Sequence, residues 1–428
     1  MVMTIKSCLQ CAVFGVIIIT GVIIMIERNS YYKKIDQFID KPLIKVITGI
    51  RRSGKSTLLK LIQRRLADYG IMDDHIIYMN FESMEYYEYR DANRLYNYVK
   101  NLMTSDKKYY LFFDEIQLVC DWEEAVNSFL VDYDVDIYIT GSNSNLLSSE
   151  LSTLLTGRYV QIPIYPLSFS EMLEFQEVYG NKDDEADLLW KYIRRGGFPS
   201  IHIADYDDES AYMVINDIYD SIVLRDVVAR HKIRNVDLLN RIMKYVMDNV
   251  GNTFSAKNIS DYFKKQQRKV DINTVYNYIS ALESSFIISR VNRYDVIGKE
   301  ILKTQEKFYL ADQGIQHAVF GYRDRNISGV LENIVYNELV RNGYHVYVGK
   351  LKDKEIDFIA ERKNEKLYVQ VTYKMEGDKT ISREFGPLLS IKDHYPKYVV
   401  SMDNHFSDII EGVKHVSLNE FITSKKIL

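Results

Sequence analysis

The most constraining feature of the chain is a glycine-containing loop at residues 49–56, Gly-Ile-Arg-Arg-Ser-Gly-Lys-Ser. An apolar run with the pattern of a buried strand, Leu43–Thr48, precedes it, and an amphipathic run with helical spacing, Thr57–Asp68, follows it. Between a strand and a helix, such a loop turns its backbone N–H groups toward phosphate oxygens, and the helix N-terminus adds partial positive charge. We therefore predict a phosphate-binding loop formed by Gly49, Ile50, Arg51, Arg52, Ser53, Gly54, Lys55, Ser56 and Thr57.

A second motif supplies the acids that such a loop needs. The apolar run Tyr109–Phe113 ends on Asp114 and Glu115, and ligands of open α/β sheets bind at the carboxyl ends of the strands. We expect Lys55 to neutralise the phosphates, Ser56 and Asp114 to hold Mg²⁺, and Glu115 to orient and deprotonate the attacking water. The two motifs together predict an ATPase whose cofactors are ATP and Mg²⁺.

Two further positions are candidates for sensing or stabilising the γ-phosphate. Thr140-Gly-Ser142-Asn143 follows another apolar run, and either Ser142 or Asn143 could contact that phosphate; a simple turn is the alternative. Arg158 could stabilise charge on the transferred phosphate as a catalytic residue, in cis or from a neighbouring subunit. A structural ion pair is the alternative for Arg158.

The order of the apolar runs predicts the fold class. Residues 43–48, 75–79, 109–113 and 135–140 are continuous apolar runs separated by helical patterns. Runs of this kind are typical of a parallel sheet covered by helices on both faces. We expect an α/β protein, with a second α/β region formed by runs at 344–348, 355–359 and 367–371 near the C-terminus.

From about Met25 to its end, the chain resembles the prokaryotic AAA-type P-loop ATPases (AAA_14-like) that carry a C-terminal DUF4143 domain. The resemblance rests on the order and spacing of short motifs: Gly49–Ser56, Phe113–Gln117, Ile139–Ser142, Thr156–Arg158, Gly196–Pro199, Val223–Asp226, Leu331–Asn333, Glu355–Asp357 and Gln370–Val371. It implies a P-loop ATPase core at 27–165, a helical lid at 166–230, a winged-helix module at 231–325 and a nuclease-like DUF4143 domain at 326–428. It also implies that Gly197 and Pro199 lie near the nucleotide. Arg225 and Asp226 would couple nucleotide state to the C-terminal half, or form a surface ion pair.

The expected winged-helix module is basic. Two helical patterns, at 255–263 and 271–282, precede two short strands, and residues 231–303 hold 13 Lys or Arg against 7 Asp or Glu, a net of +6. The whole chain has a net charge of −4. The second helix could enter a DNA groove, with phosphate contacts from Lys264, Lys265, Arg268, Lys269, Arg290 and Arg293. A module that contacts only proteins is the alternative.

The tail resembles the restriction-endonuclease-like fold. Its active members carry an acid on a first helix, an Asp on the next strand and an acid-x-Lys on the strand after, and these positions match Glu332, Asp357 and Gln370-Val-Thr372. Thr372 stands where the Lys is expected, Lys374 follows two positions later, and Gln370 is a weaker metal ligand than Glu. We therefore expect a degenerate fold with a binding or structural role rather than one that cleaves phosphodiester bonds.

The first 26 residues form a separate, apolar N-terminal segment. Residues 8–26 are long enough to be a membrane anchor, and the alternative is that Met25 is the true start and the upstream stretch is spurious. Cys8, Cys11 and Cys120 form no metal-ligand set, which fits a reducing compartment. Either alternative places the ATPase in the cytoplasm.

Three functions remain open from the sequence. The first is an ATP-hydrolysing switch that acts on DNA. The second is a nucleotide-controlled switch whose partners are proteins or further copies of the same chain. The third is an ATP-gated, metal-dependent nuclease.

Overall fold

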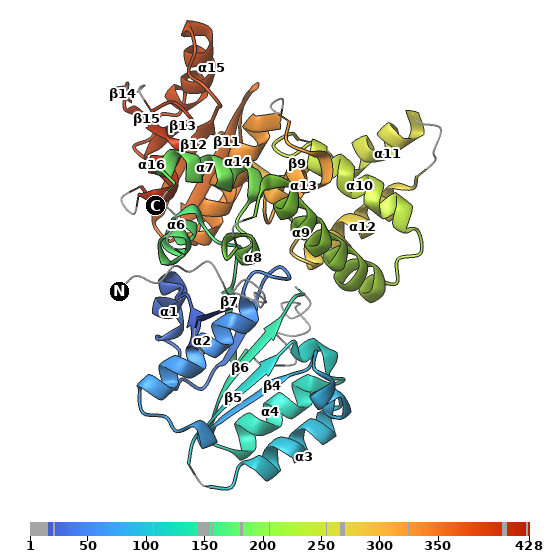
Figure 1. The fold of residues 1–428 in the computed structure, drawn as a ribbon. Helices are drawn as coiled ribbons and strands as arrows, with labels where there is room; N and C mark the ends of the chain where they lie inside the picture. Colours follow the sequence, from blue (N-terminus) through green and yellow to red (C-terminus); the bar gives the residue numbers. More distant parts are fainter. Residues whose placement is uncertain are drawn as a thin grey trace. The chain divides into compact units, whose positions relative to one another are not determined.

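The computed structural model describes residues 16–19, 22–105, 107–143, 155, 157–179, 183–204, 206–253, 255–265, 270–323, 326–404, 409–424 and 427–428. Cys8, Cys11, Thr156, Arg268 and Lys269, named above, lie outside these ranges. The chain divides into two compact units (Figure 1). Unit 1 is Met1–Pro166 with His202–Ala204 and Ser284–Phe286, and unit 2 is Leu167–Ile201, Asp205–Glu283 and Ile287–Leu428. Each unit is described by itself.

Unit 1 is built on a five-stranded sheet in the order β4-β5-β6-β3-β7, and every neighbouring pair is parallel. The prediction of a parallel α/β sheet is confirmed. Its strands are β3 (Ile44–Thr48), β4 (Ile76–Asn80), β5 (Tyr109–Asp114), β6 (Val135–Gly141) and β7 (Tyr159–Pro163). Strand β6 lies between β3 and β5, so the glycine loop and the acidic pair follow strands that are not neighbours.

Helices cover both faces of this sheet because its strands present apolar side chains to each side (Figure 1). One core packs α1 and α2 against alternate residues such as Ile47 and Phe112. The other packs α3 and α4 against residues such as Val46 and Phe113. The helices of unit 1 are α1 (Asn29–Ile35), α2 (Lys55–Asp68), α3 (Ala92–Leu102) and α4 (Trp122–Asp132), with short 3₁₀ turns η1 (Asp73–His75), η2 (Met84–Tyr89) and η3 (Ile116–Leu118).

The described part of the apolar N-terminal segment is extended rather than helical. Strands β1 (Val16–Ile19) and β2 (Val22–Met25) pair antiparallel. Among the residues that the structure describes, none of the helices combines the length and apolar character needed to cross a bilayer.

Unit 2 contains an eight-stranded mixed sheet in the order β14-β15-β13-β12-β11-β10-β8-β9. Helix α14 packs against β9 to β12, and α15 packs against β11, β12, β13 and β15. The strands are β8 (Ile288–Asp295), β9 (Glu300–Leu310), β10 (His345–Leu351), β11 (Lys354–Arg362), β12 (Glu365–Val371), β13 (Lys397–Ser401), β14 (Ile409–Ile410) and β15 (Val413–Ser417).

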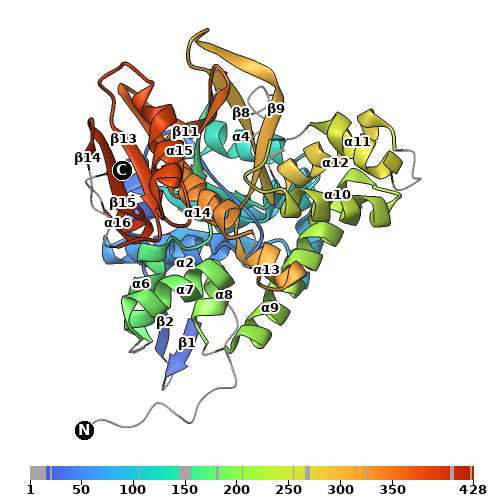
Figure 2. The same cartoon turned by 90° about the horizontal axis from the view of Figure 1, so that it is seen from above.

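The helices of unit 2 come mostly before this sheet in the chain. They are α6 (Phe169–Val178), α7 (Glu185–Arg195), α8 (Pro199–His202), α9 (Asp208–Ser221), the π-helix η5 (Ile222–Ala229), α10 (Val236–Asp248), α11 (Ala256–Lys265), α12 (Ile272–Ser284), α13 (Gly314–Phe320), α14 (Ile327–Arg341), α15 (Asp378–Leu389) and α16 (Leu418–Thr423). Helices α10, α11 and α12 gather into one group (Figure 2), with buried residues such as Met243, Phe263 and Val275.

The hairpin expected to form the wing is continuous with the C-terminal sheet. Strand β8 pairs antiparallel with β9 on one side and parallel with β10 on the other, where Arg293 lies opposite Val348. The expected boundary at residues 325 and 326 therefore separates strands that belong to one sheet.

Candidate nucleotide-binding site

The glycine loop leaves β3 and enters α2 at the carboxyl edge of the unit 1 sheet. A Cβ added to Gly49 would lie 2.0 Å from the carbonyl oxygen of Ile164, so only glycine fits where the loop begins. Gly54 caps the N-terminus of α2 with a φ of 99°, and its carbonyl accepts from the N–H of Leu58. The backbone thus adopts the tight turn that aims successive N–H groups at one point.

The side chains of the loop differ in exposure, as a phosphate cradle requires. Lys55 is buried, and its Nζ donates to the carbonyl oxygens of Gly49, 3.0 Å away, and Ile50, 3.1 Å away. The ammonium is therefore already held over the loop. Of the other loop residues, Ile50 and Ser53 are buried, and Ser56 and Thr57 are half-buried in the first turn of α2. Arg51 forms an ion pair with Glu82. Arg52 is exposed and has a φ of 68°.

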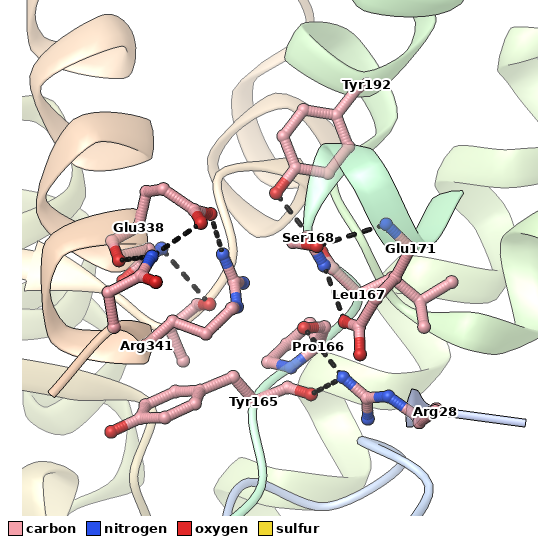
Figure 3. A network of polar contacts seen from close by, with 12 residues as sticks. Arg28, Tyr165, Pro166, Leu167, Ser168, Glu171, Tyr192, Glu338 and Arg341 are labelled. Carbon is pink, nitrogen blue, oxygen red and sulfur yellow. Dashed lines mark hydrogen bonds and ion pairs between the residues drawn. The ribbon is translucent and has the colours of Figure 1, made fainter. Parts of the chain in front are cut away.

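A buried arginine from outside the motif, Arg28, contacts both the loop and the segment after β7, and Figure 3 shows the second of these contacts. Arg28 Nη1 donates to the carbonyl oxygen of Ser53 at 3.1 Å, and Nη2 donates to that of Tyr165 at 3.0 Å. The guanidinium also lies over the ring of Tyr31, 4.5 Å from its centroid. Sequence reasoning missed Arg28, because its partners are backbone carbonyls from distant segments and leave no pattern in the chain.

Asp114 ends β5 with a fully buried carboxylate that several hydroxyl groups surround. Tyr78 donates to its Oδ2 at 3.0 Å, Thr140 donates to its Oδ1, and the Ser56 hydroxyl also hydrogen-bonds to it. Burial raises the pKa of Asp114, whereas the hydroxyl groups act in the opposite direction. The two predicted Mg²⁺ ligands, Ser56 and Asp114, are therefore adjacent and suit a hard divalent cation.

Glu115 follows Asp114 but has a left-handed backbone, with a φ of 55°. Its side chain contacts Ser142 and Gln117 rather than the hydroxyl groups around Asp114. Its N–H donates to Thr140 Oγ1 at 2.9 Å, and its Oε2 accepts from Ser142 Oγ at 3.3 Å and from Gln117. Of the two sensor candidates, Ser142 contacts Glu115, the predicted base, and Asn143, the residue after Ser142, is buried. Thr140 near the end of β6 and Ser142 just after this strand thus link both acids.

Arg158 lies at the opposite edge of the sheet from the loop. It directly precedes β7, and its carbonyl oxygen accepts from the N–H of Ile44 at the start of β3. From Ile44 to Thr48 the parallel strands span about 13 Å. Because its exposed side chain cannot cover that distance, the cis role that we predicted for Arg158 does not hold. The role across a subunit interface stays a prediction.

Within unit 2, the Gly-Gly-Phe-Pro element is a tightly packed turn after α7. Gly197 donates its N–H to Asp312 Oδ2 at 2.6 Å, and its carbonyl oxygen accepts from the N–H of Leu167 at 2.6 Å. Tyr192 donates to the carbonyl oxygen of Leu167 at 3.1 Å, beside the capping box of Ser168 and Glu171 and the ion pair of Glu338 and Arg341 (Figure 3). Contact of Gly197 and Pro199 with a nucleotide stays a prediction.

The coupling candidates Arg225 and Asp226 lie in the π-helix η5. Asp226 is buried, whereas Arg225 is exposed, so the two side chains point to different environments. π-Helical turns are rare and occur frequently at functional sites. The coupling role of Arg225 and Asp226, and the ion pair that is its alternative, stay predictions.

The nuclease-like residues come together on α14, β11 and β12, but without the expected lysine. Thr372 is buried, and Lys374 is half exposed in an ion pair with Glu376 at 3.2 Å. Gln370 Oε1 accepts from the N–H of Asp357 at 3.4 Å. A different lysine, Lys307 on β9, lies between Glu332 and Asp357.

The sheet, the loop and the acidic pair define a P-loop nucleoside triphosphate-binding protein. Residues 41–173 match the AAA domain family AAA_14. An uncharacterized protein of Haemophilus influenzae is 39% identical over 93% of this chain and 98% of its own length. An uncharacterized protein of Methanocaldococcus jannaschii is 32% identical over 78% of this chain and 75% of its own. The chain belongs to the family of AAA-type P-loop ATPases.

The comparison also corrects one label. Residues 186–326 match a domain of unknown function, DUF8612, whereas we had expected DUF4143 at 326–428.

Among solved structures, the chain is similar to a Walker-type ATPase of Pyrococcus abyssi, with 14% identity, a TM-score of 0.44 and coverage of 68% of this chain and 95% of that one. It is also similar to the Orc1 protein of Aeropyrum pernix, solved in complex with DNA, with 12% identity, a TM-score of 0.36 and coverage of 74% and 94%.

Proposed function

We propose that the chain hydrolyses ATP in the presence of Mg²⁺ and acts as a nucleotide-controlled switch. The observation that carries this proposal is the arrangement of Ser56, Asp114 and Glu115. A hydroxyl and a carboxylate are hydrogen-bonded to each other at the start of α2, and a second carboxylate lies beside them without joining that contact. Asp114 is thus placed to serve a cation and Glu115 to serve a water molecule.

Each loop residue has a separate part in the proposed reaction. The Lys55 ammonium leaves the carbonyls of Gly49 and Ile50 to bind the β- and γ-phosphates, because phosphate oxygens carry more charge than peptide carbonyls. Mg²⁺, when bound, would supply positive charge against the negative charge that develops on the phosphate oxygens. Ser56 and Asp114 orient that cation from the protein side.

Glu115 accepts the proton of the attacking water. Ser142 Oγ and Gln117 hold its Oε2, which leaves Oε1 for the water. Because Ser142 directly follows β6, the strand between the two motifs, it can transmit the position of the base to that strand.

The test is hydrolysis and nucleotide binding by two variants of the full chain. Lys55→Ala is expected to lose both, since the main cation of the loop is gone. Glu115→Gln is expected to bind ATP as the unchanged protein does but to lose about 10²–10⁴-fold in turnover. Lys60→Ala, which alters an exposed side chain on the same helix, serves as the control. Undiminished turnover in both site variants would overturn the proposal.

For the partner, we propose duplex nucleic acid bound at α11 and α12. Helix α12 exposes polar side chains that can contact base edges, Asn273 and Asn277, and one aromatic side chain, Tyr276. Lys257, Lys264 and Lys265 on α11 are exposed and suit phosphate contacts.

The basic surface is smaller than the sequence predicted. Arg290 pairs with Glu283 at 2.7 Å and with Glu306 at 3.4 Å, and Arg293 lies 3.9 Å from Glu355. These two arginines are engaged within unit 2, so the phosphate contacts expected of them are not supported.

Binding of a labelled DNA duplex at low and high salt tests this face. We expect binding that weakens steeply with salt, and a lower salt slope in a Lys264→Ala, Lys265→Ala double variant. Lys414→Ala, on the exposed side of β15, is the control. Absent or salt-insensitive binding would reject nucleic acid and favour a protein partner.

A further inference from the structure

Unit 2 contains a buried ammonium group surrounded by three carboxylates. Lys307 Nζ lies 2.9 Å from Glu355 Oε1, 3.2 Å from Glu332 Oε2 and 3.4 Å from Asp357 Oδ1. Lys307 is 1% exposed, and its partners come from β11 and α14. An ammonium has three N–H donors. Each of the three carboxylates therefore receives one donor, and the hydrogen-bonding capacity of the group is complete.

The same carboxylates hold further protein donors. Tyr309 donates its hydroxyl to Glu332 Oε2 at 3.1 Å, and the N–H of Val371 donates to Asp357 Oδ2 at 2.9 Å. Glu355 also lies 3.9 Å from Arg293. The Val371 donor is fixed by strand β12. A cation that entered the cluster would have to compete with groups that cannot move away.

The backbone after α10 covers the cluster from one side. A Cβ on Gly251 would lie 3.0 Å from Glu332 Oε2, and the φ of Gly251 is 81°. A Cβ on Gly329, one turn before Glu332 on α14, would lie 2.5 Å from the carbonyl oxygen of Val250. The chain at 250–251 thus packs directly on the helix. Only Glu355 retains substantial exposure, at 36% of its side chain.

These residues occupy the positions at which the endonuclease-like resemblance would place a divalent metal. Glu332 and Asp357 match the first two acids, but Gln370 is turned toward the N–H of Asp357. In the part of the chain that the structure describes, no group of three His, Cys, Asp or Glu side chains is arranged to hold a metal ion. The residues present do not fit the metal, because a permanent cation already lies among them.

We propose that Lys307 is a built-in cation that takes the place of the divalent metal in this nuclease-like fold. Its ammonium joins β9, α14 and β11, so the hairpin β8–β9 is held to the C-terminal sheet by charge as well as by strand pairing. The cluster therefore supports the structure and carries out no phosphodiester cleavage. This inference is independent of the ATPase proposal, since it concerns unit 2 alone.

Electrostatics favour a charged lysine at this position. Burial lowers the pKa of Lys307, but the charges of Glu332, Asp357 and Glu355 outweigh burial and raise it above the ordinary value. Removal of the ammonium would leave the buried carboxylates Glu332 and Asp357 beside Glu355, whose own remaining ion-pair partner is Arg293 at 3.9 Å, and like charges at such short range are costly in a buried site.

The experiment measures Mn²⁺ binding to the nucleotide-free full chain by equilibrium dialysis, with thermal unfolding in parallel. Unchanged protein is expected to bind no Mn²⁺ that depends on Asp357, and to leave DNA and RNA uncleaved with Mn²⁺ present. Lys307→Met keeps the shape of the stem but removes the charge. It is expected to unfold at a lower temperature, to bind about one Mn²⁺, and to regain stability with the metal.

Further variants identify the site at which Lys307→Met gains Mn²⁺ binding. Addition of Asp357→Asn to Lys307→Met is expected to abolish the Mn²⁺ binding, and Lys414→Met, an exposed lysine on β15, is expected to behave as unchanged protein. Lys307→Arg retains a cation and is expected to gain no metal binding.

Three results would overturn the inference. One is a folded Lys307→Met protein that binds no Mn²⁺. The others need no lysine variant: binding of Mn²⁺ by unchanged protein, or Mn²⁺-dependent cleavage of nucleic acid, that Asp357→Asn removes. If Lys307→Met does not fold, the measurements on unchanged protein and on Asp357→Asn still decide the question.

Discussion

The guanidinium of Arg28 donates a hydrogen bond to the carbonyl oxygen of Ser53, 3.1 Å away, and so connects the residue just before α1 to the phosphate-binding loop. The other side of the same group donates to Tyr165 and Pro166, which follow β7 (Figure 3). The loop is therefore held by a residue 25 positions before Ser53.

We predict that Arg28→Ala weakens ATP binding on the order of tenfold and lowers thermal stability. A buried charged hydrogen bond contributes roughly 1.5–3 kcal/mol, and here it holds the carbonyl whose orientation sets the loop. Binding of a fluorescent ATP analogue and thermal unfolding measure the two effects. Lys33→Ala, an exposed change on α1, is the control. Equal affinity in Arg28→Ala and the control would show that Arg28 has no part in shaping the loop.

A second prediction concerns Tyr78, whose hydroxyl donates to Asp114 Oδ2 at 3.0 Å. This bond lowers the pKa of Asp114 against the larger, opposite effect of burial. Tyr78→Phe removes it, so the carboxyl should bind a proton more readily and Mg²⁺ less tightly.

We expect the Mg²⁺ concentration for half-maximal ATPase activity to rise about 10-fold in Tyr78→Phe, with a larger effect at pH 6 than at pH 8. Mg²⁺ titrations at the two pH values measure this. Tyr87→Phe, which alters a tyrosine 57% exposed in η2, is the control. An effect of the same size at both pH values would contradict the role assigned to the hydroxyl.

The parts of the site that the sequence predicted are those encoded locally. Gly49 to Ser56 needs a strand before it and a helix after it, and Asp114 needs only a buried strand before it; both patterns lie within a few residues. Strand β7 was missed because it lies at the sheet edge and is only partly buried, so its apolar pattern is weak. Arg28 and Lys307 were missed because their partners are distant in the chain.

The count of charged residues overestimated the basic surface of residues 231–303, because it ignores which charges pair with one another in the fold. Arg290 and Arg293 add to the basic composition of residues 231–303, yet both lie against acidic side chains in the folded unit. The parallel pairing of β8 with β10 was equally hidden, because parallel strands are brought together by a crossover and leave no turn signal.

A third prediction tests whether Arg158 acts on a neighbouring subunit. Arg158→Ala retains an intact loop, and Lys55→Ala retains an intact arginine, so each alone should hydrolyse ATP poorly. If the arginine acts across an interface, a mixture of the two inactive proteins should regain a part of the activity, because some interfaces then combine both intact residues. Activity is measured against protein concentration, beside size-exclusion chromatography. A fully active Arg158→Ala protein would exclude the catalytic role.

The last prediction concerns Asp312, whose carboxylate accepts N–H donors from Gly197 at 2.6 Å and Gly314 at 2.8 Å. Burial raises the pKa of Asp312 to about 7, and the two N–H groups oppose that rise only in part. Because the folded pKa lies above the unfolded value of about 3.9, the folded state binds the proton more tightly. The stability that Asp312 contributes is therefore fully present below about pH 4, declines as the pH rises toward 7, and is constant above that.

Denaturant unfolding of unchanged protein and of Asp312→Asn between pH 5 and pH 8 measures this effect. The variant cannot ionise, so the free energy of unfolding of unchanged protein should fall relative to it as the pH rises, by on the order of 2–4 kcal/mol over the whole transition. Asp353→Asn, at an exposed turn of unit 2, should leave the pH dependence unchanged. The opposite outcome is a free energy of unfolding of unchanged protein that stays constant, or rises, relative to that of Asp312→Asn as the pH increases. It would mean that Asp312 is already ionised below pH 5 in the folded protein. The turn at Gly197 would then be held by a carboxylate at every pH that the protein tolerates.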